Sequence, residues 1–441
     1  MPANARIVAV AVTAAACLGA TAVPAAATTD TDAVISRGVT IPTFYNPPTT
    51  LPVADGALVR SEPLPLALSL PGINGPLPGT ATRLMYKSTD SGGRPVAVTG
   101  AYIEPTAAWK GNGARPLVAV APGTMGQGDQ CATSLGLEHP LQVNGQTVSV
   151  GYETLAVYRL LAEGIAVVVA DYAGLGATDR LHTYVNRVDE AHAVLDAVRA
   201  ARSLPGTSVT ANSRVALFGY SQGGGATAAA AELQASYAPD VTLAGTYSGA
   251  PPADLTEVTK AIDGSELAGA LGWSVNGFLQ SDPTLRPIAE AHLNAAGHAA
   301  LTDLSTMCVG DALFAYNSTR STAWTTDGRP ISDIIAEEPA LRAFLADQRI
   351  GTIKPTGPIR LATGTSDNLV PHAQARQLAV DWCRKGAEVT YKYVALPDVG
   401  SSLINHFAPL LTDQGEAISW LTDRLDGKPA TSNCSSLPVL P

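Results

Sequence analysis

The sequence is poor in charged side chains. Asp, Glu, Lys and Arg make up 15% of the 441 residues, well below the usual quarter, and the formal net charge is −10. Such a surface does not attract nucleic acid or acidic lipid headgroups by long-range charge, so neither is expected as a partner. The apolar run near the N-terminus, residues 7–23, is shorter than the roughly 20 residues that a membrane-spanning helix needs.

Cysteine is also scarce. Of the five cysteines, Cys17 lies in the N-terminal apolar run, and four follow it: Cys131, Cys308, Cys383 and Cys434. None of these four has a Cys or His at zinc-ligand spacing, so no metal site is expected. An even number in an exported protein suggests two disulfides.

Export is indicated by the first 28 residues. Arg6 precedes the Ala-rich run, and Pro-Ala-Ala-Ala-Thr at residues 24–28 offers an A-x-A site for cleavage after Ala27. We therefore expect residues 1–27 to be a signal peptide and the mature protein to be secreted, remaining extracellular or associated with the cell surface. Retention of the run as an anchor and lipidation of Cys17 stay open as alternatives.

The rest of the chain shows an α/β pattern that is interrupted once. Residues 28–80 are rich in Pro and Thr, and we expect an extended N-terminal arm, with a partly disordered linker as the alternative. In residues 81–252 and 351–441, apolar strands alternate with helices, which is typical of a mostly parallel sheet covered on both faces. Residues 253–350 lose the strand signal, so we expect a helical cap inserted into the core.

The patterns predict a definite order of elements. The expected strands are 81–87 and 95–103, which read as a hairpin, then 115–121, 165–170, 215–218, 242–246, 358–363 and 389–395. The expected helices outside the insertion are 152–163, 188–202, 226–237, 373–385 and 414–425.

The stretch 214–226 joins a strand to a helix through the motif G-x-S-x-G. Residues 215–218 are β-prone and continuously apolar, and strong helix formers follow from Ala226. A sharp strand-to-helix turn between them leaves the hydroxyl of Ser221 exposed at the end of the strand. We identify Ser221 as a nucleophile; the alternative is a Gly-rich turn whose serine caps the helix.

An acid and a base follow in the order of an α/β-hydrolase. Asp367 comes directly after the strand at 358–363, and His406 is expected on the loop after the last strand. The Asp367 carboxylate would hold the His406 imidazole in the required tautomer and stabilise its charged form. His372 also follows Asp367 and is the chief rival as base, although its position at the start of a helix places it closer to the acid than to Ser221.

The third requirement of this chemistry is an oxyanion hole made of backbone N–H donors. Gln222, the residue after the nucleophile, is expected to supply one donor. The second is expected from the Gly-rich loop at 122–129, with Thr124 as first choice and Met125 as second. The alternative for this loop is an ordinary tight turn.

These residues resemble those of the secretory lipases of the Candida antarctica lipase A type, over nearly all of the mature chain. The resemblance rests on residues 44–48 (Phe-Tyr-Asn-Pro-Pro), 129–132 (Asp-Gln-Cys-Ala), 219–223 (Gly-Tyr-Ser-Gln-Gly), 236–239 (Ser-Tyr-Ala-Pro), 290–295 (Glu-Ala-His-Leu-Asn-Ala), 367–371 (Asp-Asn-Leu-Val-Pro) and 383–387 (Cys-Arg-Lys-Gly-Ala).

The resemblance implies an exported α/β-hydrolase with a helical cap that cleaves carboxylic esters of lipids, triacylglycerol among them, without a cofactor. Its nucleophile, acid and base fall on Ser221, Asp367 and His406. It also implies transient contact with a lipid interface, and the disulfides Cys131–Cys308 and Cys383–Cys434. Two alternatives stay open: an exported acyltransferase with the same triad, and a hydrolase-fold binding module without catalysis.

An apolar stripe in the insertion suggests where an acyl chain binds. Between residues 267 and 279, apolar side chains recur every four residues and two aromatic residues widen the stripe: Leu267, Leu271, Val275 and Leu279, with Trp273 and Phe278. We expect these helices to wall an acyl-sized pocket facing Ser221. The alternative is that the stripe only holds the cap together.

Overall fold

A sheet of nine strands organises the protein. The computed structural model describes residues 33–72, 75–144 and 146–439, all of them within one unit, Ala33–Pro441. The strands of the sheet are β3 (Leu58–Leu64), β4 (Gly79–Thr89), β5 (Pro95–Pro105), β6 (Leu117–Ala121), β9 (Ala166–Ala173), β10 (Val215–Tyr220), β11 (Leu243–Gly249), β12 (Ile359–Gly364) and β13 (Val389–Val394). The signal peptide expected at residues 1–27 lies outside the described residues.

The strand order is β13-β12-β11-β10-β6-β9-β5-β4-β3. The six strands from β13 to β9 run parallel to their neighbours, whereas β5, β4 and β3 pair antiparallel at one side. The predicted α/β-hydrolase fold with a mostly parallel sheet is confirmed. Because parallel strands point their carboxyl ends to one edge, the loops after β6, β10, β12 and β13 meet there.

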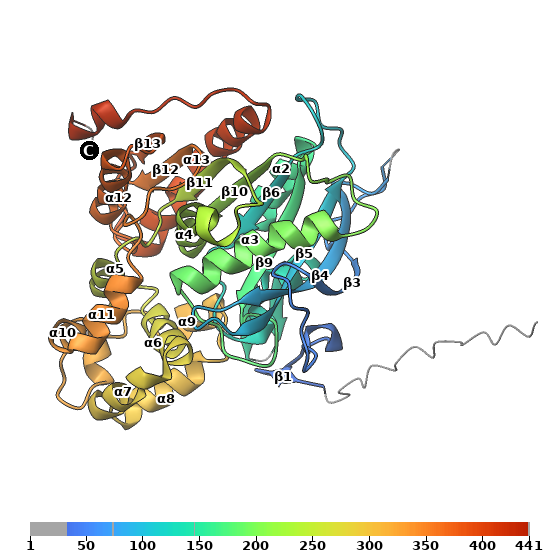
Figure 1. Cartoon of the computed structure of the whole chain (residues 1–441). Coiled ribbons are helices and arrows are strands. Elements are labelled where there is room, and N and C mark those ends of the chain that lie inside the picture. Colours follow the sequence, from blue (N-terminus) through green and yellow to red (C-terminus); the bar gives the residue numbers. More distant parts are fainter. Residues whose placement is uncertain (1–32, 73–74, 145, 440–441) are drawn as a thin grey trace, which may run out of the picture. The chain divides into compact units, whose positions relative to one another are not determined.

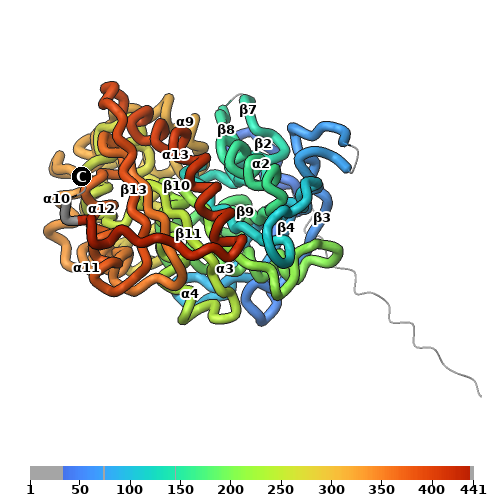
Figure 2. Tube along the Cα trace, turned by 90° about the horizontal axis from the view of Figure 1, so that it is seen from above, coloured from blue at the N-terminus to red at the C-terminus, as the bar shows by residue number. Residues whose placement is uncertain are grey.

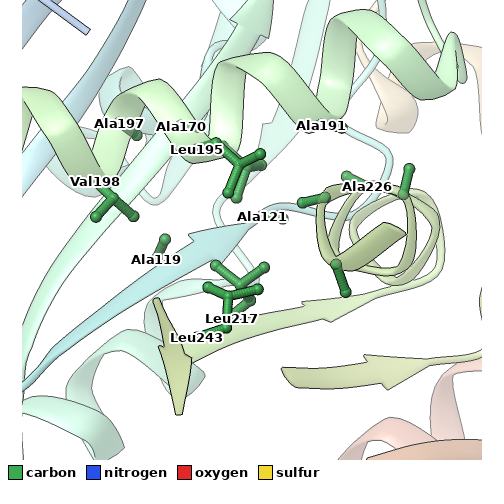
Figure 3. Packing of buried hydrophobic residues seen from close by; sticks show 14 of the residues in the cluster. Ala119, Ala121, Ala170, Ala191, Leu195, Ala197, Val198, Leu217, Ala226 and Leu243 are labelled. Atoms are coloured by element: carbon green, nitrogen blue, oxygen red, sulfur yellow. The ribbon is translucent and has the colours of Figure 1, made fainter. Parts of the chain in front are cut away.

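Helices cover both faces of the sheet. On one face lie α3 (Arg187–Ser203), α4 (Gln222–Tyr237) and α12 (His372–Arg384); on the other lie α2 (Thr154–Ala162) and α13 (Ser402–Leu425). The packing under α3 and α4 uses small side chains such as Ala191 and Ala226, together with Leu217 of β10 (Figure 3). Small residues let the two helices approach the sheet and each other closely, so α3 packs beside α4.

The chain between β11 and β12 is helical. It contains α5 (Leu255–Ile262), α6 (Gly269–Ser281), α7 (Arg286–His292), α8 (Ala295–Leu304), α9 (Val309–Ala315), α10 (Ile331–Glu337) and α11 (Pro339–Asp347). Helices α6, α7, α8, α10 and α11 gather beside the sheet, at the lower left of Figure 1. They have an apolar core of their own, which includes Trp273, Leu304 and Trp324.

Smaller elements complete the fold. They are the strand pair β1 (Ile35–Ser36) and β2 (Val39–Thr40), the hairpin β7 (Leu141–Asn144) and β8 (Thr147–Val150), and the short helix α1 (Thr133–Glu138).

The structure differs from the sequence expectations at the N-terminal arm and at the last helix, and it contains α1, β7 and β8 where the sequence analysis predicts no element. Part of the segment expected as an arm, β3, joins the main sheet as its edge strand, where Pro63 is tolerated because an edge residue has no partner on one side. The last helix begins at Ser402 instead of residue 414. His406 therefore lies on α13, and the expected loop position for His406 is wrong.

Two disulfides join the pairs that the resemblance implies. Cys131–Cys308 links the segment after β6 to the start of α9, and Cys383–Cys434 links the end of α12 to η5 (Cys434–Val439). Figures 1 and 2 show the C-terminal segment, in red, running from the end of α13 back to α12. The second disulfide thus pins a Pro/Ser-rich tail to the last βα unit.

We expect the double variant Cys383→Ser/Cys434→Ser to lose about 4 kcal/mol of unfolding free energy, because this disulfide closes a loop of 51 residues in the unfolded chain. Urea unfolding of the variant and the parent, followed by circular dichroism, measures the difference. An unchanged urea midpoint would contradict the stabilising role assigned to this link.

Candidate active site

Ser221 occupies a strained turn between β10 and α4. Its backbone has φ 58° and ψ −124°, a conformation that L-residues avoid and that costs on the order of 1–3 kcal/mol. A hydrogen bond from the Ser221 N–H to the carbonyl of Gly249 at 2.9 Å helps to hold it. The turn is the elbow that the G-x-S-x-G motif predicts.

Two glycines make this elbow sterically possible. A Cβ added at Gly219 would lie 2.1 Å from the carbonyl oxygen of Gly223, and one added at Gly223 would lie 2.0 Å from the carbonyl oxygen of Ala121. Both contacts are far below van der Waals distance, so neither position accepts a side chain without a shift of backbone. The two glycines of the G-x-S-x-G motif are therefore steric requirements of this turn.

Asp367 and His406 form a buried pair. Nδ1 of His406 lies 2.7 Å from Oδ2 of Asp367, and Oδ1 of Asp367 accepts the N–H groups of Leu369 and Val370 at 3.1 and 3.0 Å. The carboxylate is therefore fixed by its own loop. In the neutral imidazole this contact places the proton on Nδ1, so Nε2 is left as the basic nitrogen.

The residue before the nucleophile forms a hydrogen bond with the backbone of His406. The phenol of Tyr220, the residue before Ser221, donates a hydrogen bond to the carbonyl of His406 at 2.7 Å. Ser221 and His406 line the same pocket. The Ser221 hydroxyl makes no hydrogen bond to any residue that the structure describes, so it is open to a substrate carbonyl.

The rival base His372 lies elsewhere. It is the first residue of α12, and its Nε2 lies 3.3 Å from the hydroxyl of Tyr391 on β13. It does not line the pocket of Ser221 among the described residues. The Asp367 side chain bonds His406, and His406 lines the pocket of Ser221, which supports the choice of His406 as the base.

A residue of the helical insertion caps the helix that bears His406. The carboxylate of Glu266 accepts hydrogen bonds from the hydroxyls of Ser401 and Ser402 and from the N–H of Leu403. The Leu403 N–H is the main reason that the pKa of Glu266 lies below its usual range. A negative charge at this end is stabilised by the α13 dipole, so the insertion helps to order the start of α13.

Two of the three candidate oxyanion residues reach the pocket. Thr124 and Gln222 line it together with Ser221, and Gln222 is the first residue of α4, so its N–H has no helical carbonyl to bond. Met125 does not line this pocket in the described part of the chain. Its side chain packs on the Cys131–Cys308 disulfide, and its carbonyl accepts the N–H of Val309.

The side chain of Gln222 contacts two buried residues that the sequence analysis did not single out. Its Nε2 lies 2.8 Å from Oε1 of Glu190 on α3 and 3.0 Å from Nε2 of His182. No sequence motif marks either residue, because Glu190 reads as one more polar position on a helix and His182 as an isolated histidine.

The pocket of Ser221 adjoins a larger apolar cavity. The pocket spans about 550 Å³, including the space open to solvent, and is lined by Leu267, Leu271 and Phe278 from the insertion. The neighbouring cavity spans about 730 Å³ on the same measure, is lined entirely by the insertion, and shares a wall with the pocket, formed by Thr259, Leu271, Ser274 and Phe278. An apolar chain attached to a carbonyl at Ser221 would have this cavity beside it.

The predicted apolar stripe lines these spaces except at one position. Leu271, Val275, Leu279 and Phe278 line the larger cavity. Trp273 is wrong as a wall residue, because its side chain is fully buried and its indole N–H donates to the carbonyl of Leu304 at 2.9 Å. It belongs to the core of the insertion, on the side of α6 that faces α8.

Within residues 33–72, 75–144 and 146–439, no group of three or more His, Cys, Asp or Glu side chains is arranged to hold a metal ion. None of the helices in these ranges has the length and apolar character needed to cross a bilayer.

Comparison with known proteins identifies relatives over most of the chain. A model of the secretory lipase family matches residues 137–433. A probable inactive lipase of Mycobacterium tuberculosis is 30% identical over 391 residues, which cover 88% of this chain and 83% of the relative. Lipase 10 of Candida albicans is 26% identical over 404 residues, which cover 89% and 82% of the two chains.

Two solved structures show the same fold. Candida antarctica lipase A in its closed state superposes with a TM-score of 0.70 at 19% identity, covering 86% of this chain and 84% of that one. A rice cell wall degrading esterase from Xanthomonas oryzae gives a TM-score of 0.68 at 20% identity, covering 85% and 100%. At these identities the likeness concerns the fold alone.

Proposed function

This chain belongs to the secretory lipase family, and on that premise we propose that it hydrolyses lipid esters through an acyl-enzyme formed on Ser221. Membership supports a carboxylic ester hydrolase. The observation that most supports the proposed mechanism is the His406–Asp367 pair, whose histidine lines the same pocket as the serine of the elbow.

In the first half-reaction, Ser221 Oγ attacks the ester carbonyl while His406 Nε2 takes the hydroxyl proton. Asp367 stabilises the imidazolium that forms. The carbonyl oxygen gains a negative charge, which the N–H groups of Gln222 and Thr124 would bind. His406 then gives its proton to the leaving alcohol, and the acyl group stays on Ser221.

The second half-reaction repeats these roles with water. His406 takes a proton from the water that attacks the acyl-enzyme carbonyl, and returns it to Ser221 as the acid leaves. No cofactor enters either step. The proposal therefore needs only an ester and water in the pocket.

One relative is named as a probable inactive lipase, so catalysis in this chain needs its own argument. Loss of a triad member removes most of the catalysis. Here Ser221 lies in the strained turn that a nucleophile needs, and His406 contacts the carboxylate of Asp367. All three residues are buried at the carboxyl edge of the sheet. These features support an active enzyme.

Hydrolysis of a chromogenic short-chain ester by the purified protein tests the proposal. We expect saturable release of the alcohol by the parent enzyme. A folded parent protein that releases no more alcohol than buffer would leave a hydrolase-fold binding module as the remaining interpretation.

We also propose that residues 1–27 direct export and are removed after Ala27, and that α5 to α11 act as a cap. The family is secretory, two disulfides suit an oxidising compartment, and the insertion contributes Leu267, Leu271 and Phe278 to the pocket. The transient contact with a lipid interface is part of the same proposal, because a lipid ester reaches the enzyme from such a surface.

We expect catalytic efficiency to rise from acetate towards medium-chain or long-chain esters. Each methylene that enters the apolar cavity contributes roughly 0.8 kcal/mol, or about a fourfold gain in kcat/KM, until the cavity is full. A series of p-nitrophenyl esters of increasing chain length measures the trend. A preference for acetate over octanoate would contradict the assignment of the cavity to an acyl chain.

The variant Phe278→Gln sharpens this test. Phe278 lines both the pocket and the cavity, and the centroid of its ring lies 4.9 Å from that of Phe344. A polar side chain at this position is therefore expected to weaken the rise of kcat/KM with chain length. Acetate hydrolysis should be nearly unchanged. Leu411→Gln is the control for an apolar-to-polar change, since Leu411 is exposed on α13 and lines neither space among the described residues.

A further inference from the structure

Glu190 is a buried acid next to the site with no role in the proposed chemical steps. It lies near the start of α3 and is 2% exposed. One of its oxygens, Oε1, accepts two hydrogen bonds: from Nε2 of Gln222 at 2.8 Å and from the backbone N–H of Val185 at 2.9 Å. A single atom thus joins the first turn of α4 to the loop that precedes α3.

Each of these two donors belongs to, or lies near, a residue of the proposed oxyanion hole. Gln222 itself supplies one of the two proposed donors, its backbone N–H. Val185 follows Tyr184, whose hydroxyl lies 2.7 Å from Oγ1 of Thr124, and both Tyr184 and Thr124 line the pocket of Ser221. Burial raises the pKa of the Tyr184 phenol, so it keeps the proton that it can donate to Thr124.

The loop at Val185 needs such a support. Its φ of 56° lies in the left-handed region, which a β-branched residue adopts only under strain of on the order of 1–3 kcal/mol. The hydrogen bond to Glu190 is formed by the N–H of this strained residue. Without the acceptor oxygen of Glu190, the backbone at Val185 is free to leave the strained conformation. The ring of Tyr184, the preceding residue, would then shift with it.

His182 accepts the second N–H hydrogen of the Gln222 side-chain amide. His182 Nδ1 lies 3.0 Å from the carbonyl of Ala173, which can only accept, so Nδ1 bears the proton and Nε2 is free to accept from Gln222. Burial lowers the pKa of His182 to about 4, so the ring stays neutral and keeps this acceptor. Glu190 and His182 together use both hydrogens of the amide and determine its position.

We propose that Glu190 is a positioning residue for the oxyanion hole, which it aligns through Gln222 on one side and through Val185 and Tyr184 on the other. This inference rests on the proposed function. Glu190 acts as a hydrogen-bond acceptor, because its Oε1 bonds both N–H donors, and burial raises its pKa to about 8. A glutamine at this position would keep the accepting oxygen, whereas a methionine would fill the space without it.

The test compares Glu190→Met with Glu190→Gln in ester hydrolysis and in binding of an alkyl trifluoromethyl ketone. Ser221 Oγ adds to the ketone carbon, its proton passes to His406, and the ketone oxygen becomes an alkoxide in the oxyanion hole. Misplaced donors weaken this adduct and slow catalysis but leave ester binding alone. We expect Glu190→Met to lose on the order of 10² in kcat and in ketone affinity, with KM unchanged.

Glu190→Gln is expected to stay close to the parent in all three quantities. The matched control is Asp196→Asn, another buried acid on α3, which bonds Ser88 and Tyr237 and does not line the pocket in the described residues. The Asp196→Asn variant measures how much kcat and ketone affinity fall when α3 is disturbed away from the pocket. We expect its ketone affinity to equal that of the parent. Gln222→Met removes the hydrogen bond between Gln222 and Glu190 by changing its donor, so its kcat and ketone affinity should fall as in Glu190→Met. If Glu190→Met does not fold, Gln222→Met takes its place in the test.

Ketone affinity and kcat that are unchanged in Glu190→Met, or in Gln222→Met if the former does not fold, would overturn the inference. So would a loss in Glu190→Gln as large as that in Glu190→Met. Failure of the parent enzyme itself to bind the ketone or cleave esters would instead overturn the proposed function, and the inference with it.

Discussion

Replacing Ser221 with alanine is expected to lower kcat for ester hydrolysis on the order of 10⁶-fold while the protein stays folded. Without the Oγ nucleophile no acyl-enzyme forms, and His406 has no serine proton to take. The fold should persist because the Ser221 hydroxyl bonds no other described residue and the elbow depends on the backbone and on Gly219 and Gly223. Initial rates with a chromogenic ester, with circular dichroism for the fold, measure both.

The Ser221→Ala variant should still bind ester. The apolar cavity and the oxyanion donors remain in place, so the dissociation constant of a non-cleaved substrate should be close to the KM of the parent when chemistry limits turnover. Activity in this variant near that of the parent would mean that another residue is the nucleophile.

His406→Ala is expected to be nearly as inactive as Ser221→Ala, whereas His372→Ala should keep most of its activity. The imidazole of His406 bonds Asp367 and lines the pocket of Ser221. His372 contacts Tyr391 on β13, so its loss should affect packing more than chemistry. Comparing kcat of the two variants at neutral pH distinguishes the roles, and the reverse order of activities would show that the base is His372.

The elbow could be predicted from the sequence because its determinants are local. A continuously apolar strand, two glycines that allow close backbone contact, and helix formers directly afterwards all fall within residues 214–237. The order of serine, acid and base then followed from the order of the strands. Local patterns of this kind are also why most of the predicted strands and helices lie within a few residues of those in the structure.

The first half of α13 could not be predicted because tertiary packing overrides a local signal. Pro409 lies inside this helix, although proline normally ends a helix. The structure accommodates it against the end of β12, where a Cβ at Gly364 would lie 2.5 Å from Pro409 Cγ. A glycine 45 positions away thus leaves room for the proline, and no local pattern reports such a pair.

The environment of Gln222 is hidden from the sequence for a similar reason. Glu190, His182 and Gln222 come from three separate segments and meet only because small residues let α3 approach α4. In the sequence, each is an isolated polar residue. Contacts of this kind require the fold first, whereas the nucleophile, acid and base could be identified before it.

The most direct test of the central claim is labelling with a serine-directed p-nitrophenyl alkylphosphonate, followed by peptide mapping. Ser221 Oγ should attack phosphorus and expel p-nitrophenolate, since the elbow, His406 and the oxyanion donors activate one serine alone. The account predicts one phosphonyl group per chain, on the peptide that contains Ser221, with loss of esterase activity in proportion to labelling. A label on a different serine, or complete labelling that leaves activity intact, would contradict it.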